Sequence, residues 1–268
     1  MSTRTRILFF VTAWAIVLMP FLFWRSTWFG RRLSDAELNQ YLHDTQKPRH
    51  IQHALVQIGE RISSRDPQAS RWYPELVRLS SYPVEEIRAT DAWVMGQDVS
   101  RPEFHQALLH LLNDPSGNVR GNAALALVRF GDASGRPQLV EMLKPATLAA
   151  PEAGTIVDGA KPGTAVRQGG TVSKLASNGR IVEIRSPLTG RVAFAAARGA
   201  QVAAGSEIAR VEPSTEQVWE ALRALFVVGQ LDDLSAVRPY ERSTPEMPER
   251  VREQAAATEH AILQRAAQ

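Results

Sequence analysis

The sequence predicts a multidomain α plus β fold: an N-terminal transmembrane helix, a short α-solenoid of helix pairs, an inserted small all-β domain, and C-terminal helices that continue the solenoid. Three observations predict it. The chain opens with an apolar run, and a two-helix pattern of about 35 residues recurs on both sides of its middle. Between these helices, a stretch repeats itself after 36 residues. Such internal repeats indicate stacked or quasi-symmetric units.

The apolar run covers residues 7–24, from Ile7 to Trp24, and contains no charged residue. About 20 apolar residues span a bilayer core, so this run with its flank to residue 29 is long enough. Bulky Trp, Phe and Arg residues follow it instead of the small residues of a signal-peptide cleavage site, which favours a retained anchor. We therefore expect residues 1–30 to be a tail and a single-pass anchor in the cell inner membrane.

Charges flank the run on both sides, with Arg4 and Arg6 before it and Arg25, Arg31 and Arg32 after it. The distribution of arginine alone favours a cytoplasmic body. A short internal tail followed by a large exported domain is nevertheless the commoner arrangement for signal anchors. We predict an exported, periplasmic body, which makes this a protein of the bacterial envelope.

Residues 34–147 follow a helical period interrupted by prolines, and they begin with the capping box Ser34-Asp35-Ala36-Glu37. Two blocks in this region align with each other: "YPVEEIRATDAW" and "DPSGNVRGNAAL" place Arg88 on Arg120. A similar helical pattern returns over residues 214–268. Residues 146–150 and 213–215 are small or polar, so we expect them to be joints around the domain between.

The segment "DPSGNVRGNAALALVRFGD" resembles a HEAT repeat. Asp114 precedes Arg120 by six residues, as in the inter-repeat ladder of that family, and Arg88 occupies the position of Arg120 in the repeat before. The resemblance implies an armadillo-like solenoid whose surface binds protein. The phrase P-x-x-x-V-R-x-x-A-A returns near residues 248–256 with its proline one position out of register.

In the central stretch, each copy reads P-x-x-G-x-(apolar) and then G-x-x-V-x-x-G. The copies open at Pro151 and Pro187, and three pairs of glycines follow at equivalent positions: Gly154 and Gly190, Gly163 and Gly199, Gly169 and Gly205. Glycine allows the positive φ or close backbone approach that tight turns between short strands need. Asn178-Gly179 lies between β-prone runs and predicts a two-residue hairpin that joins the copies.

The segment "VEIRSPLTGRVAFAAARGAQVAAGSEIARVEP" resembles the second half of a biotin carrier domain, and equally the hybrid domain of membrane-fusion (periplasmic adaptor) proteins. The resemblance implies a biotinyl/lipoyl-type barrel-sandwich hybrid over residues 151–213. In carriers, a lysine eight residues before the proline of the Ser-Pro pair takes the cofactor. Here that position is Gly179, and the nearest lysine, Lys174, lies further along the strand. We expect no bound cofactor.

Nothing else in the sequence points to chemistry. The histidines form two short-spaced pairs, His50 with His53 and His105 with His110, and no carboxylate-rich shell accompanies either pair. The chain has no cysteine, and its net charge of +3 is too small and too scattered for a nucleic-acid protein. We predict no catalytic residues, no metal and no nucleic acid. Three tryptophans fall on apolar helix faces and are expected in the core: Trp72, Trp93 and Trp219.

These features predict a membrane-anchored, non-enzymatic scaffold that binds one or more protein partners, such as those of a membrane transport or envelope complex. The bilayer itself is a partner through the N-terminal helix. Two alternatives remain: an accessory adaptor subunit of a membrane export complex, and a biotin or lipoyl carrier modified at another residue such as Lys174. A chromophore lyase would rest on the repeat alone, which is fold-level analogy.

Overall fold

The computed structural model describes residues 14, 18, 19, 31–242 and 247–267. The predicted anchor residues Ile7 and Trp24 lie outside this set. Among the described residues, no helix has both the length and the apolar character needed to cross a bilayer. The described residues form two compact units, divided between residues 75 and 76.

The first unit is helical. Its elements are α2 (Asp35–Leu42), α3 (Pro48–Ser63), the 3-10 helix η1 (Pro67–Trp72) and the beginning of α4 (Tyr73–Leu79). The predicted capping box is confirmed: the Ser34 hydroxyl accepts from the Glu37 N–H at 3.3 Å, and the Glu37 carboxylate accepts from the Ser34 N–H at 2.9 Å. The buried face carries apolar residues at helical spacing, including Leu38, Leu42, Ile51, Leu55 and Ile58.

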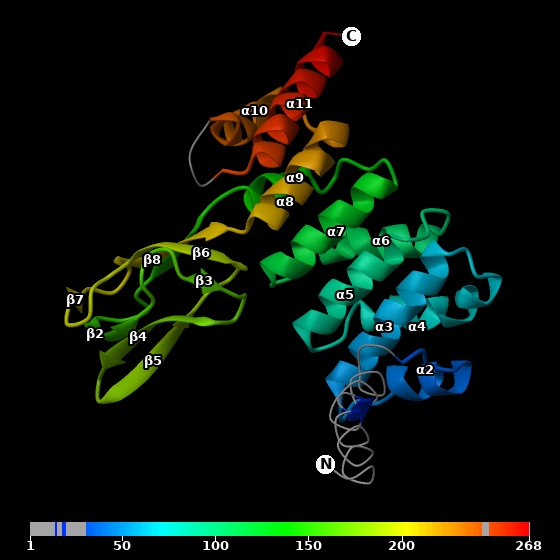
Figure 1. Cartoon of the computed structure of the whole chain (residues 1–268), viewed down its shortest axis with the longest axis horizontal. Helices are drawn as coiled ribbons and strands as arrows, with labels where there is room; N and C mark the ends of the chain where they lie inside the picture. The colour runs from blue at the N-terminus through cyan, green and yellow to red at the C-terminus, as the bar shows by residue number, and fades with distance from the viewer. Residues whose placement is uncertain (1–13, 15–17, 20–30, 243–246, 268) are drawn as a thin grey trace, which may run out of the picture. The chain divides into compact units, whose positions relative to one another are not determined.

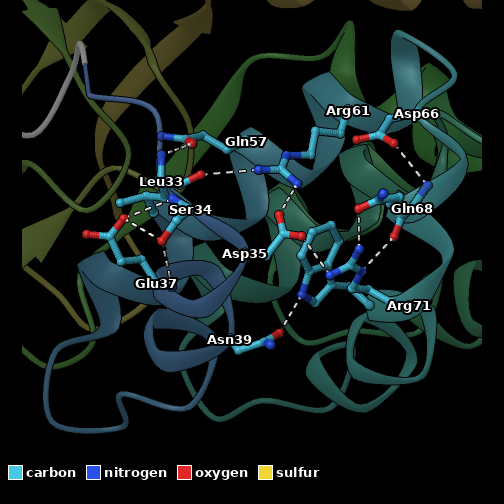
Figure 2. A network of polar contacts seen from close by, with 11 residues as sticks. Leu33, Ser34, Asp35, Glu37, Asn39, Gln57, Arg61, Asp66, Gln68 and Arg71 are labelled. Atoms are coloured by element: carbon cyan, nitrogen blue, oxygen red, sulfur yellow. Dashed lines mark hydrogen bonds and ion pairs between the residues drawn. The ribbon is translucent and has the colours of Figure 1, made fainter.

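A polar network ties the elements of this unit together (Figure 2). Asp35 at the start of α2 accepts hydrogen bonds from Arg61 of α3 at 2.6 Å and from Arg71 of η1 at 2.7 Å. The bond from Arg61 is the largest effect that keeps the pKa of Asp35 below its usual value. Both guanidinium groups lie 5.1 Å from the ring centroid of Trp72, whose indole N–H donates to Asn39 at 2.6 Å. The buried Trp72 therefore matches its prediction as a core residue.

The helices of the second unit that precede its strands form the pairs that the sequence predicts. They are α5 (Glu85–Met95), α6 (Pro102–Leu111), α7 (Gly117–Arg129) and α8 (Arg136–Met142). The first helices of successive pairs, α5 and α7, pack against each other, and α6 and α8 pack on α7. Small residues set the closest approaches, because a Cβ added at Gly135 would lie 2.7 Å from Ala124.

One tryptophan prediction for these helices is wrong. Trp93 on α5 is 41% exposed and does not belong to the core. Its neighbours Ala92 and Val94 are among the residues that α5 buries, so Trp93 lies off the packed face. Trp219 on α9 is partly buried, and the guanidinium groups of Arg223 and Arg250 lie 4.6 Å and 5.5 Å from its ring centroid.

Between α8 and α9 the chain forms two four-stranded antiparallel sheets (Figure 1). We call residues 146–213 the β module. One sheet has the order β1-β8-β6-β3 and the other β5-β4-β2-β7. The strands are β1 (Ala146–Ala149), β2 (Gly154–Gly159), β3 (Ala165–Val166), β4 (Thr171–Ser177), β5 (Arg180–Arg185), β6 (Gly190–Ala195), β7 (Gln201–Val202) and β8 (Glu207–Pro213).

The repeat of 36 residues becomes a symmetry of these sheets. Strands β2, β3 and β4 have counterparts 36 residues later in β6, β7 and β8, and β1 has its counterpart in β5. Gly163 and Gly199 have φ values of 88° and 89°, and Gly169 and Gly205 have 74° and 81°. The halves meet through the β4–β5 hairpin, where Asn178 and Gly179 both have positive φ. The module contains two buried apolar clusters, each with residues of both copies: one has Ile156, Leu175, Ile184 and Ile208, and the other has Val172, Val192, Ala209 and Val211.

Residues 146–150 are not the joint that the sequence predicts. Ala146–Ala149 form β1, which pairs antiparallel with β8 so that Ala146 lies opposite Val211. Leu148 packs against both apolar clusters of the β module. The prediction failed because the repeated motif of prolines and glycines begins at Pro151, after β1. No glycine or proline in β1 indicates that this segment belongs to the module.

The chain leaves β8 directly into α9 (Thr215–Val228), capped by Ser214. The remaining elements are η2 (Leu231–Asp233), α10 (Leu234–Val237), η3 (Arg238–Glu241) and α11 (Glu249–Ala266). Helix α11 packs on α9, and the Thr258 hydroxyl bonds the Leu222 carbonyl at 2.9 Å across that contact. Helix α9 packs on α7 and α8, so the helical packing continues on both sides of the β module in sequence.

The C-terminal helices contain a carboxyl pair that predicts a pH dependence. A hydrogen bond with Glu259 on α11, followed by burial, raises the pKa of Glu241 on η3 from 4.5 to about 7. A carboxyl whose folded pKa is raised stabilises the fold fully below its unfolded pKa, and this contribution is lost as pH rises through the folded pKa. Protection of α11 from hydrogen exchange, corrected for intrinsic rates, should therefore decrease between pH 4.5 and pH 7 or slightly above. Glu241→Gln should remove that decrease, and an unchanged pH profile in the variant would contradict the assignment.

Candidate functional site

The repeat ladder centres on an ion pair between Arg88 on α5 and Asp114, which precedes α7. The guanidinium Nε donates to one carboxylate oxygen at 2.6 Å and Nη2 donates to the other at 2.9 Å. The remaining nitrogen, Nη1, donates to the carbonyls of Tyr82 at 2.7 Å and Pro83 at 3.1 Å. Arg88 thus joins the loop before α5 to the loop before α7, the first helix of the following pair. This contact fixes the register of the two repeats.

The environment of Asp114 keeps it ionised. Burial opposes ionisation, but the hydrogen bonds from the Arg88 guanidinium and the Ser116 N–H outweigh burial and lower the pKa of Asp114. The same pairing raises the pKa of Arg88. The side chains are 12% and 5% exposed, so the pair lies largely out of water. Such a pair is costly to break from one side, because the remaining charge stays buried without a partner.

Arg120 on α7 repeats half of this arrangement. Its Nη1 donates to the carbonyls of Asp114 at 2.8 Å and Pro115 at 3.0 Å, the same two loop positions that Arg88 holds in the repeat before. Within the described ranges, no carboxylate binds the edge formed by its Nε and Nη2. The three ladder residues predicted from the sequence, Arg88, Asp114 and Arg120, are thus in contact, but the ladder ends at Arg120.

A second ion pair joins the helices on either side of the β module in sequence. Arg136 at the start of α8 donates to both carboxylate oxygens of Asp233 in η2, at 2.9 Å and 3.1 Å. The Tyr240 hydroxyl donates to the Leu143 carbonyl, and burial raises the pKa of Tyr240 to about 12. The sequence prediction missed both contacts. Both contacts join residues 97 positions apart, and such contacts leave no local pattern in the sequence.

The hairpin of the β module offers no acceptor side chain at its tip. Asn178 and Gly179 form the turn, and the Asn178 amide donates to Glu152 at 3.2 Å. Lys174 lies within β4, with its ammonium 3.9 Å from a carboxylate oxygen of Glu183 on the neighbouring strand. The module therefore presents a short polar turn where a carrier domain presents a lysine.

The histidine pairs of the sequence do not come together as sites. His105 contacts Asp132 at 2.7 Å, and His50 contacts Asp44 at 2.6 Å, each in a separate side-chain hydrogen bond. Over the described parts of the chain, no three potential ligands among His, Asp and Glu gather closely enough to hold a metal ion.

The helical repeats match a known family. The family model described as HEAT repeats matches residues 73–149. The prediction of such repeats from the Asp114 and Arg120 pattern is confirmed, and the match ends at the last residue of β1.

Other comparisons add little to this. No curated protein matches the chain. Among solved structures, the chain is similar to the crystal structure of an engineered protein from the Northeast Structural Genomics Consortium. The two are 16% identical, the similarity covers 85% of this chain and 78% of that one, and the TM-score is 0.41.

Proposed function

We propose that the protein is a membrane-anchored, non-enzymatic scaffold that holds a protein partner near the bilayer. The observation that carries the proposal is the HEAT-repeat region at residues 73–149, because stacked helix pairs of this kind present extended surfaces that bind proteins. The bidentate Arg88–Asp114 pair supports it further, since a fixed register between repeats keeps such a surface pre-organised.

The apolar run at residues 7–24 supports the membrane tether, and we propose that it spans the inner membrane with the body on the exported side. Tethering would raise the effective concentration of the protein for partners in the same membrane without any chemistry. The preferred partner is accordingly a component of a membrane transport or envelope complex.

The β module completes the proposal as a lipoyl-like contact domain without an acceptor lysine. Its two symmetric sheets and the Asn178-Gly179 hairpin support the resemblance to barrel-sandwich hybrid domains. Because the tip position is Gly179, the module would serve as a rigid interaction surface and carry no swinging cofactor arm.

Cross-linking the full-length protein in native membranes and identifying the co-purified proteins by mass spectrometry tests this function. Transport or envelope proteins with exported domains among the cross-linked partners would support the scaffold and its orientation together. Recovery of cytoplasmic carboxylase or acyltransferase subunits would overturn both and place the body on the other side.

The absence of a cofactor arm gives a separate prediction. The intact mass of the chain purified from its native host should equal the mass expected from the sequence, with no biotinyl or lipoyl addition. A mass increase that maps to Lys174 would contradict the scaffold and indicate a carrier. A Lys174→Arg variant provides the control, since it removes this acceptor but keeps the charge beside Glu183.

A further inference from the structure

A cavity of about 290 Å³ lies beside Arg120, lined by the start of α7, the end of α8 and the turns of the β module. Met142, Pro187 and Leu188 provide apolar wall, and Arg120, Gln138 and Gln168 provide polar groups. Gly121 lets the Met142 side chain lie directly against α7, since an added Cβ would be 3.1 Å from its sulfur. The volume suits one or two amino-acid side chains and is small for a larger ligand.

Arg120 brings an unused binding edge to this cavity. Arg88 shows what the same edge does one repeat earlier: its Nε and Nη2 hold both oxygens of Asp114, at 2.6 Å and 2.9 Å. Arg120 uses only Nη1, for loop carbonyls. A planar guanidinium edge matches the two oxygens of a carboxylate, so the protein contains its own template for the missing ligand.

The β module explains why no carboxylate of the described residues bonds this edge of Arg120. Asp114 lies 26 residues after Arg88, and the residue 26 positions after Arg120 is Ala146, the first residue of β1. Alanine has no carboxylate, so the ladder stops where the sheet begins. The wall residue Glu141 is 3.1 Å from Lys144 in an exposed ion pair. The Arg120 charge helps to lower the pKa of Asp114, but both oxygens of that carboxylate bond Arg88.

Gln138 donates its amide N–H to the Leu112 carbonyl at 3.3 Å, and its Oε1 is buried away from solvent. The guanidinium of Arg120 is therefore the group that selects the ligand, and the carboxylate of an aspartate or glutamate residue matches its planar edge.

We propose that this cavity binds an acidic residue, Asp or Glu, in a segment of the partner polypeptide. Arg120 takes the side-chain carboxylate of that residue through Nε and Nη2. The proposal rests on the scaffold function above and assigns the chemistry of one contact: an electrostatic, bidentate anchor that completes the ladder in trans.

Selection of a random dodecapeptide phage library on the full-length chain in detergent tests the proposal. Enriched peptides are synthesised with a fluorophore and titrated by fluorescence anisotropy. We expect a shared Asp or Glu whose replacement by Asn or Gln weakens binding at least tenfold. Arg120→Lys keeps the charge but loses the planar edge, and it should weaken binding by a similar factor. Arg120→Gln should abolish it.

Arg129→Gln is the matched control, because Arg129 lies on the same helix and its guanidinium contacts only Gln97 at 3.1 Å among the described side chains. It should bind the peptides as wild type does. Peptides without a shared acidic residue, binding unchanged in Arg120→Lys, or a selection that enriches nothing would overturn the acidic anchor. Full competition by millimolar acetate would also overturn it in favour of a small-anion site. None of these outcomes affects the cross-linking test of the scaffold, which needs no particular cavity.

Discussion

Arg88→Ala is expected to cost about 3 kcal/mol of unfolding free energy, because it leaves the buried Asp114 carboxylate without its charge partner. The side chain of Asp114 is only 5% exposed, so water replaces the guanidinium poorly. The variant also removes the donor to the Tyr82 and Pro83 carbonyls. Denaturant unfolding combined with hydrogen exchange of α5 and α7 measures the loss and locates it.

The pH dependence of this variant provides a second readout. A carboxyl whose folded pKa is lowered stabilises the fold above its unfolded pKa of 3.8, and this contribution is lost as pH falls through the folded value. The unfolding free energy of the variant should therefore fall less than that of the wild type when the pH drops below 4. Arg129→Ala, an exposed change on α7, should cost less than about 0.5 kcal/mol. Equal effects of the two substitutions would contradict a ladder that holds the repeats in register.

Gly190→Ala is expected to disrupt the β module. A Cβ at this position would lie 1.8 Å from the Glu212 carbonyl oxygen on β8, and that oxygen belongs to the backbone of a paired strand. The counterpart in the other half, Gly154, shows the same constraint with 2.4 Å to the Ala176 oxygen. Separation of β6 from β8 should cost about 3 kcal/mol or more. Loss of protection in β6 and β8 by hydrogen exchange measures it.

Gly199→Ala is the matched control for that substitution. Gly199 belongs to the same copy of the repeat and has φ of 89°, but an added Cβ would meet nothing within 4 Å. Only backbone strain opposes the alanine, so a cost of about 1–2 kcal/mol is expected. If Gly199→Ala proved as damaging as Gly190→Ala, close strand approach would not be the reason for glycine at position 190.

The sequence predicts local features of this protein better than distant ones. The capping box at Ser34 and the glycine turns follow from a few neighbouring residues, and the HEAT repeats follow from a short motif around Arg120. The strand β1 was missed because Ala146–Ala149 resembles a linker until β8 is available to pair with it. Trp93 was misassigned because helix periodicity shows which residues share a face but not how far the packed face extends.

In the candidate site, too, the sequence predicts the local contacts and misses the distant ones. The ladder residues Arg88, Asp114 and Arg120 were found from their spacing. The sequence did not predict that Nε and Nη2 of Arg120 lack a carboxylate partner among the described residues, because this depends on what the β module places beside α7. The Arg136–Asp233 pair joins residues that the whole β module separates in the sequence. Only the folded chain relates them.

If the folded body binds a protein at the membrane, site-specific photocross-linking in the native host will capture that protein. Benzoylphenylalanine replaces Trp93, which is 41% exposed on α5, or Ile181, which is 64% exposed on β5. We expect the benzoylphenylalanine at position 93, in the HEAT repeats, to cross-link to a specific membrane or envelope protein. Illumination that yields no protein adduct from either position, with the chain intact in the membrane fraction, would contradict it.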